Sequence, residues 1–285
     1  IERALGLDLD TPGYYIISNS TPFAKSIAKE HSNIFLIEEE KQLDTWQLLQ
    51  NEQIKKYIDS IDNTSVIVFK NTKQIEKTCE ENNWKLLNPS AELSDKIEEK
   101  ISQLKWLGEL KKYLPKTSIQ LCKDIDFTNE KFILQFNRAH TGSGTFLIQS
   151  KEQIDELKIK FPERECRVTK YIEGPTFNNN NVVTKNKILI GNINYQITGL
   201  QPFTDQRFAT IGNDWAFPHR YLNEDQIEQY KKIVNEIGEK LKADGWKGLF
   251  GVDIVVDDKT GKLYLIEINA RQPASTTLES KLQQE

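Results

Sequence analysis

The residue that this sequence most clearly lacks is methionine. Its 285 residues include 0 Met, although an ordinary composition would supply roughly half a dozen. Position 1 is an isoleucine, so even an initiator methionine is missing. We therefore expect the native protein to extend beyond these 285 residues.

Cysteine and long apolar runs are also scarce, and each shortage excludes a class of protein. Cys79, Cys122 and Cys166 stand far apart, and neither a CxxC motif nor a Cys/His cluster accompanies them. This spacing supports neither a disulfide framework nor a zinc site, and it predicts reduced thiols in a cytoplasmic protein. No apolar run approaches the roughly 20 residues of a membrane-spanning helix, and the start, IERALGLDLD, is not typical of a signal peptide.

An excess of positive charge is missing as well. Lys and Arg number 38 and Asp and Glu number 42, which gives a net charge of −4. A domain that binds the phosphates of nucleic acid would be strongly basic, so we expect no nucleic-acid partner. With 38% hydrophobic and 28% charged residues, the composition is that of a folded globular protein.

The first part of the chain has the pattern of a parallel α/β layer. Residues 1–88 alternate short β-prone runs with helical segments. One of the expected helices passes through Trp46, Leu49 and Ile54. The expected strands are Tyr14–Ile17, Asn33–Ile37, Ser65–Phe69 and Trp84–Leu87.

The rest of the chain has a different pattern, with more β-prone runs and fewer regular crossovers. A long helical stretch covers residues 91–110, and Asn223 caps a second long helix that ends near Gly245. Residues 199–220 form a long irregular stretch, a length that is typical of functional or disordered loops. The expected strands fall within residues 132–136, 145–148, 167–172, 182–195, 250–256 and 263–269.

The last two expected strands carry the residues with the clearest chemistry. Asp253 lies among apolar residues of the first strand, and Glu267 and Asn269 lie two residues apart in the second. Alternation along a strand places Glu267 and Asn269 on one face, so three oxygen donors can converge across the hairpin. Such donors suit Mg²⁺, which commonly binds one or two carboxylates together with substrate phosphates. Arg271 continues the same face, where a cation can hold a phosphate.

Four segments give the chain a resemblance to the ATP-grasp superfamily. EINAR at 267–271, preceded by Asp253, resembles the E-x-N metal signature of that family. DKIEEK at 95–100 resembles its D-K-x-x-x-K segment, HTGSGT at 140–145 its glycine-rich flap, and VTKYIEG at 168–174 its hinge. The segments follow the order of the family over roughly residues 90–275.

The resemblance implies a fold of mixed α/β and α+β class with two domains. A parallel α/β domain of the preATP-grasp type would cover residues 1–88, and a two-lobed ATP-grasp fold would cover residues 89–285. The small lobe with the flap would take about residues 91–168, and the large lobe with the metal site about residues 169–285.

The resemblance also implies a cofactor pair and the residues that hold it. Asp253, Glu267 and Asn269 would bind Mg²⁺, with Mn²⁺ as the alternative metal, and Arg271 would be catalytic by steadying an acylphosphate. Lys96 would approach the phosphates of ATP. The complete set of implied ATP-binding residues is Lys96, Gln135, Gly142, Ser143, Gly144, Lys170, Tyr171, Ile172 and Glu173.

Three positions depart from the pattern of the family. Gln135 stands where the flap strand normally carries a lysine that contacts phosphates, so either another cation, such as Arg138, compensates or the affinity for ATP is lower. Thr169 stands where the hinge often has an acidic residue. Ser275 replaces the glutamate that activates bicarbonate in biotin carboxylases, which argues against carboxylation of biotin.

The resemblance implies an ATP- and Mg²⁺-dependent ligase. It would activate a substrate carboxylate as an acylphosphate for attack by an amine or another nucleophile. A bicarbonate-using carboxylase or carbamoyl-phosphate-like enzyme is one alternative, and a non-catalytic nucleotide-binding module, favoured by Gln135 and Thr169, is another. The implied partners are small-molecule carboxylate and amine substrates, and a homodimer is the implied assembly.

The acceptor pocket is the least defined part of these expectations. Arg207 and Arg220, in the irregular stretch, are either a clamp for a carboxylate or solvated loop charges. Asn178 and Asn180 share one strand face and either line the site or contribute surface polarity. Part of this pocket would also lie beyond the 285 residues if the native chain is longer.

Overall fold

The computed structural model describes residues 1–285 except residues 2–3, 5, 7–8, 138–143 and 285. The chain divides into two compact units. The first contains Ile1–Ser94 and Arg271–Glu285, and the second contains Asp95–Ala270. Within the described parts of the chain, no helix is both long and apolar enough to cross a membrane.

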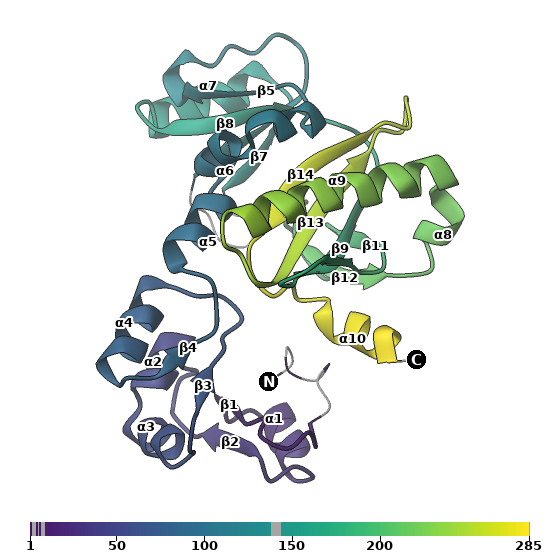
Figure 1. Cartoon of the computed structure of the whole chain (residues 1–285). Coiled ribbons are helices and arrows are strands. Elements are labelled where there is room, and N and C mark those ends of the chain that lie inside the picture. The colour runs from purple at the N-terminus through teal and green to yellow at the C-terminus, as the bar shows by residue number, and fades with distance from the viewer. Residues whose placement is uncertain (2–3, 5, 7–8, 138–143, 285) are drawn as a thin grey trace. The chain divides into compact units, whose positions relative to one another are not determined.

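Parallel strand pairs and short helices build the first unit (Figure 1). β1 (Ile16–Asn19) pairs in parallel with β2 (Ile34–Ile37), and β3 (Ser65–Val66) pairs in parallel with β4 (Lys85–Leu86). The strands therefore form two small sheets, and the third and fourth strands are shorter than expected. The helices of this unit are α1 (Pro22–Ala28), α2 (Thr45–Gln50), α3 (Glu52–Asp59), α4 (Lys73–Glu81) and α10 (Thr276–Gln284).

The single helix expected through Trp46, Leu49 and Ile54 is two helices in the structure, so that expectation was wrong. Asn51 has extended backbone angles of φ −67° and ψ 130°, and it separates α2 from α3. Its side-chain oxygen accepts hydrogen bonds from the backbone N–H groups of Gln53 and Ile54. A good N-cap residue thus begins a new helix inside an otherwise helical pattern.

The single helix expected over residues 91–110 is also interrupted. It is replaced by α5 (Ala91–Glu98), α6 (Lys100–Leu107) and the 3₁₀ helix η2 (Gly108–Tyr113). Glu99 is extended, with φ −69° and ψ 135°. The side chain of Asn137 accepts from the Ile101 N–H at 2.9 Å and donates to the Glu99 carboxylate at 2.8 Å. A residue distant in sequence therefore caps α6, which no local pattern reveals.

The second unit contains two antiparallel sheets, of which the smaller has the strand order β5-β8-β6-β7. Gln135 on β6 lies opposite Arg167 on β8 and Thr145 on β7. Leu134 and Ile154 are fully buried in the apolar core of this sheet and α7. The bounds are β5 (Thr117–Leu121), η3 (Cys122–Asp124), β6 (Phe132–Phe136), β7 (Thr145–Ile148), α7 (Lys151–Lys160) and β8 (Glu165–Lys170).

The larger sheet has the strand order β12-β11-β9-β13-β14, and β10 pairs with β9 beside this path. Helix α9 lies along the sheet (Figure 1), is capped by Asn223 as expected, and buries Tyr230 and Ile237. β14 ends the strand order, so one of its edges meets no other strand of the described chain. The bounds are β9 (Thr176–Val183), β10 (Ile188–Ile190), β11 (Asn194–Thr198), β12 (Thr210–Asp214), α8 (Pro218–Tyr221), α9 (Glu224–Ala243), β13 (Gly248–Val256) and β14 (Leu263–Asn269).

Strand β9 begins earlier than the sequence predicts. It includes the run of asparagines at 178–181, although asparagine is depleted in strands. Asn179 and Asn181 are buried, and their side chains hydrogen-bond to each other at 2.7 Å. Polar pairing inside the fold thus offsets a weak strand propensity.

The parallel pairs of the first unit and the antiparallel sheets and helices of the second confirm the expected class. The fold is mixed, with α/β elements before α+β elements. The residues with the clearest chemistry lie in the second unit.

Candidate active site

Four polar side chains stand in one row across the larger sheet. Asp253 on β13 pairs with Glu267 on β14 and, on its other side, with Asn178 on β9. Asn178 pairs in turn with Asn194 on β11. Directly opposed residues point to the same face, and neighbouring strands lie about 4.8 Å apart. Two carboxylates and two amides therefore lie side by side.

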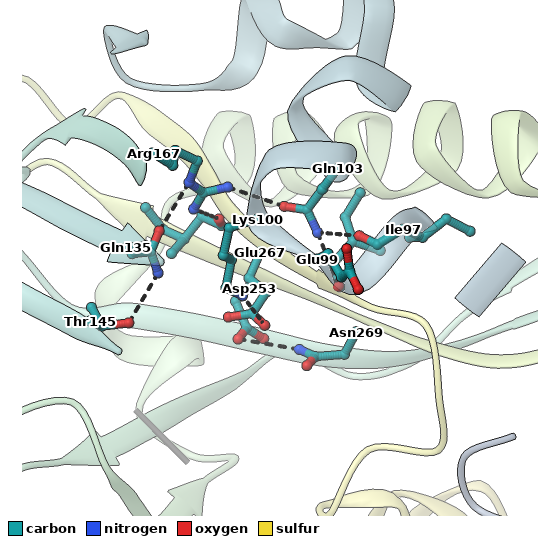
Figure 2. Close-up of polar contacts among 12 residues, drawn as sticks. Ile97, Glu99, Lys100, Gln103, Gln135, Thr145, Arg167, Asp253, Glu267 and Asn269 are labelled. Atoms are coloured by element: carbon teal, nitrogen blue, oxygen red, sulfur yellow. Dashed lines mark hydrogen bonds and ion pairs between the residues drawn. The ribbon is translucent and has the colours of Figure 1, made fainter. Parts of the chain in front are cut away.

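Asn269 completes the carboxylate end of this row. Its side-chain nitrogen donates to the Asp253 carboxylate at 3.4 Å. Figure 2 shows Asp253, Glu267 and Asn269 close together, and all three are partly exposed. Among the described residues, no group of three His, Cys, Asp or Glu side chains is placed to hold a metal ion. The donor set at this point is instead two carboxylates and one amide.

Lys100 brings a cation to the same carboxylates. It is the first residue of α6, and its ammonium group lies 2.5 Å from the Glu267 carboxylate. The Lys100 side chain is 14% exposed and that of Glu267 is 27% exposed. Lys96, the lysine expected to approach phosphates, is exposed and lines a surface hollow with Trp106. The structure thus brings Lys100, the second lysine of the DKIEEK segment, to the carboxylate cluster.

The edge of β14 is held by side chains on both sides of Glu267. The register between β13 and β14 shifts by one residue just before Glu267, so Ile266 is an extra, bulged residue. The Ile266 carbonyl accepts from Arg167 Nη2 at 3.0 Å. The Ile268 carbonyl accepts from Gln103 Nε2 at 3.2 Å. Bulges beside functional sites re-aim side chains, and these two bonds hold this bulge in place.

Arg167 is a buried cation behind this edge (Figure 2). The residue is 3% exposed, its Nε donates to Gln135 Oε1 at 2.9 Å, and its Nη1 donates to Gln103 Oε1 at 3.3 Å. Burial lowers the pKa of Arg167 to about 10, while the charge of Glu267 acts in the opposite direction. Arg167 therefore remains positively charged at neutral pH.

The contact with Arg167 also determines how the Gln135 amide is turned. Arginine can only donate, so the amide must present its oxygen to Arg167 and its nitrogen to the other side. That nitrogen donates to Thr145 Oγ1 at 3.2 Å. The sequence left two possibilities open at Gln135: another cation, such as Arg138, compensates, or the affinity for ATP is lower. Arg138 lies outside the described residues, and among the described residues Arg167 is a cation in contact with Gln135.

The opposite face of the larger sheet supports the carboxylates from behind. The Tyr230 hydroxyl on α9 donates to the carbonyl of Val252, the residue before Asp253, at 3.1 Å. Burial and the charge of Asp253 raise the pKa of Tyr230 well above its usual value. Tyr230 therefore stays neutral and fixes β13 next to Asp253.

The segment between β8 and β9 carries the residues expected to bind adenine. The Tyr171 N–H donates to the Lys131 carbonyl at 3.3 Å. The Arg207 guanidinium lies 5.9 Å from the centre of the Tyr171 ring and donates to its hydroxyl at 3.3 Å. A side chain at Gly174, which has φ 151°, would clash with the Val256 carbonyl, so glycine is required there. Arg207 thus lies at this segment, whereas its role toward a carboxylate stays a prediction.

Other expected site residues lie in different parts of the chain. Gly142 and Ser143 lie outside the described residues. The Gly144 carbonyl accepts from the Phe136 N–H at 3.1 Å, which closes the base of the loop between β6 and β7. Arg271 belongs to the first unit, so its expected catalytic role stays a prediction.

Other residues of the site were not singled out from the sequence. They are Lys100, Gln103, Arg167 and Asn194. Arg167 carried no clear signal, because it lies in the polar run ECRVTK and alternates with Glu165 and Thr169, as a residue on a solvent-facing strand side would. Gln103 carried no clear signal either, since glutamine is common on the exposed face of a helix.

The arrangement can hold a cation and an anion next to each other. Asp253, Glu267 and Asn269 offer hard oxygen ligands, and Lys100 offers an ammonium group at the same place. Such a combination would suit a divalent metal ion and a bound anion at the same place.

Comparison with known proteins identifies the family of this arrangement. A model of the ATP-grasp domain matches residues 97–275, which is more than half of the chain. A search of curated proteins gives no match.

Several solved structures share the fold. They include biotin carboxylase from Campylobacter jejuni (TM-score 0.69, 16% identity, 98% of this chain and 64% of that one). N5-carboxyaminoimidazole synthetase from Staphylococcus aureus, complexed with ADP, has a TM-score of 0.64, with 15% identity over 95% of this chain and 67% of that one. D-alanine–D-alanine ligase from Bacillus anthracis has a TM-score of 0.63, with 15% identity over 94% of this chain and 91% of that one. The chain spans 66% of the similar synthetase from Thermotoga maritima.

Proposed function

The chain belongs to the ATP-grasp family, and we propose that it is an ATP-dependent ligase that joins a small carboxylate to an amine. The observation that carries this proposal is the meeting of Lys100 with Asp253, Glu267 and Asn269 on one face of the larger sheet. The substrate carboxylate would attack the γ-phosphoryl group of ATP and form an acylphosphate and ADP. The amine would then displace inorganic phosphate and form the amide.

The metal site of this proposal is made of Asp253, Glu267 and Asn269. The two carboxylates and the amide fit Mg²⁺, or Mn²⁺ in its place, because both metals accept oxygen donors. When bound, the metal supplies positive charge to the transferred phosphoryl group. The bulge at Ile266 and the Tyr230 bond to Val252 support these ligands by holding β14 and β13.

The phosphates of ATP would lie between the carboxylate cluster and the loop between β6 and β7. We assign the role of the phosphate-binding lysine to Lys100, because its ammonium group already lies at Glu267. Gln135 and Gly144, with Gly142 and Ser143, would complete the phosphate site. The role expected for Lys96 remains a prediction that variants can decide.

Adenine would bind at the hinge, between Lys170 and Glu173. The Tyr171 N–H has a partner in the Lys131 carbonyl, so we expect the adenine edge to use Ile172 and the carbonyl groups of the hinge. The catalytic role of steadying the acylphosphate is proposed for Arg271. In this proposal residues 1–88 form the preATP-grasp domain and residues 89–285 the ATP-grasp domain, with the lobes divided near residue 169.

A cytoplasmic location is part of the proposal. Three buried free thiols suit a reducing compartment, and ATP is available there as a substrate. Small-molecule carboxylates and amines are the proposed partners, and a homodimer is the proposed assembly.

Phosphate release tests the function directly. The chain is incubated with ATP and Mg²⁺ and a panel of amino acids and small carboxylates, each with and without an amine. We expect release that depends on one carboxylate and increases with an amine. Release that depends on bicarbonate would favour a carboxylase, and ATP binding without release under any condition would favour a nucleotide-binding module; either result contradicts the ligase.

The metal site has its own test in Glu267→Gln. The substitution keeps the size of the side chain but removes its charge, so Mg²⁺-dependent phosphate release should fall at least about 100-fold. Glu228→Gln on α9, where an exposed carboxylate likewise pairs with a lysine at 3.0 Å, is the matched control for a lost carboxylate. An unchanged dependence on Mg²⁺ in Glu267→Gln would remove Glu267 from the metal site.

A further inference from the structure

Arg167 is an unusual residue to find in the interior of this unit. It is 3% exposed, yet its three hydrogen-bond partners are all neutral: Gln135, Gln103 and the Ile266 carbonyl. Transferring a guanidinium from water into a protein interior is costly unless other charges or hydrogen bonds compensate. The carboxylate that acts on it electrostatically, Glu267, is already in an ion pair with Lys100.

Arg167 therefore places a positive charge at the Gln135 end of the site. Glu267 carries one negative charge and faces both Lys100 and Arg167. Because the surroundings of Arg167 contain little water, its field is weakly screened and extends toward neighbouring groups. An anion bound near Gln135 would experience this field.

Arg167 also fixes the orientation of the Gln135 side-chain amide. The guanidinium holds the amide oxygen at 2.9 Å, so the amide nitrogen is turned toward Thr145, which begins β7. An amide nitrogen has two hydrogens, and Thr145 takes one of them. The other hydrogen can donate to a ligand bound beside Gln135. Without Arg167, the amide would be free to turn over and present its oxygen, which repels phosphate.

We infer that Arg167 is a positioning residue for the phosphates of the nucleotide: it fixes the donor side of Gln135 toward them and supplies from β8 the positive charge that β6 lacks. This inference rests on the proposed nucleotide-dependent function. In this inference Arg167 supplies the positive charge for the phosphates without touching them, because Gln135 lies between Arg167 and the ligand.

The test compares ligands with and without phosphate. The dissociation constants of ADP and adenosine are measured by calorimetry in EDTA, so that metal binding at Glu267 does not contribute. In the unsubstituted protein ADP should bind more tightly than adenosine. We define the ratio as the dissociation constant of adenosine divided by that of ADP. Arg167→Gln should lower this ratio roughly tenfold, because ADP affinity falls while adenosine affinity is unchanged. The double variant Gln135→Lys with Arg167→Gln, which moves the cation to β6, should restore the ratio to within about threefold.

Two further variants keep the test decisive. Gln135→Leu leaves the buried guanidinium two of its acceptors and should still lower the ratio about threefold if Arg167→Gln does not fold. Arg164→Gln is the matched control, because Arg164 precedes β8, stacks at 4.0 Å on the Phe136 ring and is exposed. It removes the same charge and should leave the ratio unchanged.

The outcomes separate this inference from the proposed function. Equal losses of ADP and adenosine affinity in Arg167→Gln, or an unchanged ratio in both Arg167→Gln and Gln135→Leu, would overturn the positioning role. If the unsubstituted protein binds neither ADP nor adenosine, the nucleotide-dependent function itself fails. If turnover is measurable, the KM for ATP should rise in Arg167→Gln while kcat stays within about threefold.

Discussion

Arg167 and Lys100 are two cations that act on the same carboxylate, Glu267, but the fold holds them in opposite ways. Arg167 is sealed in the interior, and three fixed hydrogen bonds occupy its guanidinium. Lys100 is 14% exposed and pairs with Glu267 through a flexible side chain at 2.5 Å. A sealed cation can organise its surroundings, whereas an accessible cation can exchange one anion for another.

Because Arg167 is buried and Lys100 is partly exposed, mutations of the two residues should affect different properties, stability in one case and activity in the other. When a buried charged side chain is removed, its desolvated hydrogen-bond partners are left unsatisfied. The loss of Arg167 is therefore expected to destabilise the fold. A partly exposed ion pair contributes little to stability, because water replaces either partner. The region around Arg167 should therefore respond to mutation mainly in folding and in the orientation of Gln135, and the region around Lys100 mainly in activity.

The largest expected effect is that of Arg167→Met on stability. The substitution orphans the Gln135 and Gln103 oxygens and the Ile266 carbonyl, so the free energy of unfolding should fall by about 3–5 kcal/mol. Urea unfolding followed by circular dichroism measures it. Arg164→Met removes an exposed cation from an aromatic ring and should cost at most about 1 kcal/mol. Equal losses of unfolding free energy in the two variants would show that the buried Arg167 contributes no more to stability than the exposed Arg164.

A smaller effect is expected from Lys100→Met, and it should appear in activity. Loss of the ammonium group at Glu267 should lower kcat/KM for ATP about tenfold, while the free energy of unfolding changes by less than about 1 kcal/mol. Lys96→Met is the matched variant from the same segment, and its kcat/KM should change less than about twofold. A larger loss in Lys96→Met than in Lys100→Met would return the phosphate role to Lys96.

The smallest expected effect concerns a second pair of residues, one buried and one exposed, which are both tyrosines. Tyr230 is sealed, whereas Tyr221 is accessible and donates to Asp258 at 2.8 Å. Burial and the hydrogen bond to Asp258 raise the pKa of Tyr221 to about 12. The folded protein holds this proton more tightly than the unfolded chain, so the stabilisation is complete below about pH 10 and is lost as the pH rises toward 12.

Tyr221→Phe measures that contribution. It should cost about 1 kcal/mol at pH 8, and the gap between variant and unsubstituted protein should narrow between pH 10 and pH 12. Unfolding free energies measured at several pH values provide the check. A gap that stays constant across this range would mean that the Tyr221 proton does not contribute.

The success of sequence reasoning differed between the two ends of the site. Asp253, Glu267 and Asn269 were visible because strand alternation and the hairpin register bring them together, and both are properties of a local pattern. Arg167 and Gln103 were missed because their partners on strands β6 and β14 are 32 to 165 residues away in sequence. The break before Lys100 was missed for the same reason, since Asn137, which follows β6 and is distant in sequence, caps α6.

The sequence by itself determined the mixed fold class, the family and the carboxylate hairpin, because these depend on periodicity, caps and motifs that act over a few residues or repeat in order along the chain. Only the tertiary structure decided which lysine of the DKIEEK segment meets Glu267, which cation contacts Gln135, and how the asparagines of β9 are accommodated. The physical reason is that a buried polar group must find its hydrogen-bond partners in three dimensions, and those partners come from elements that the sequence separates.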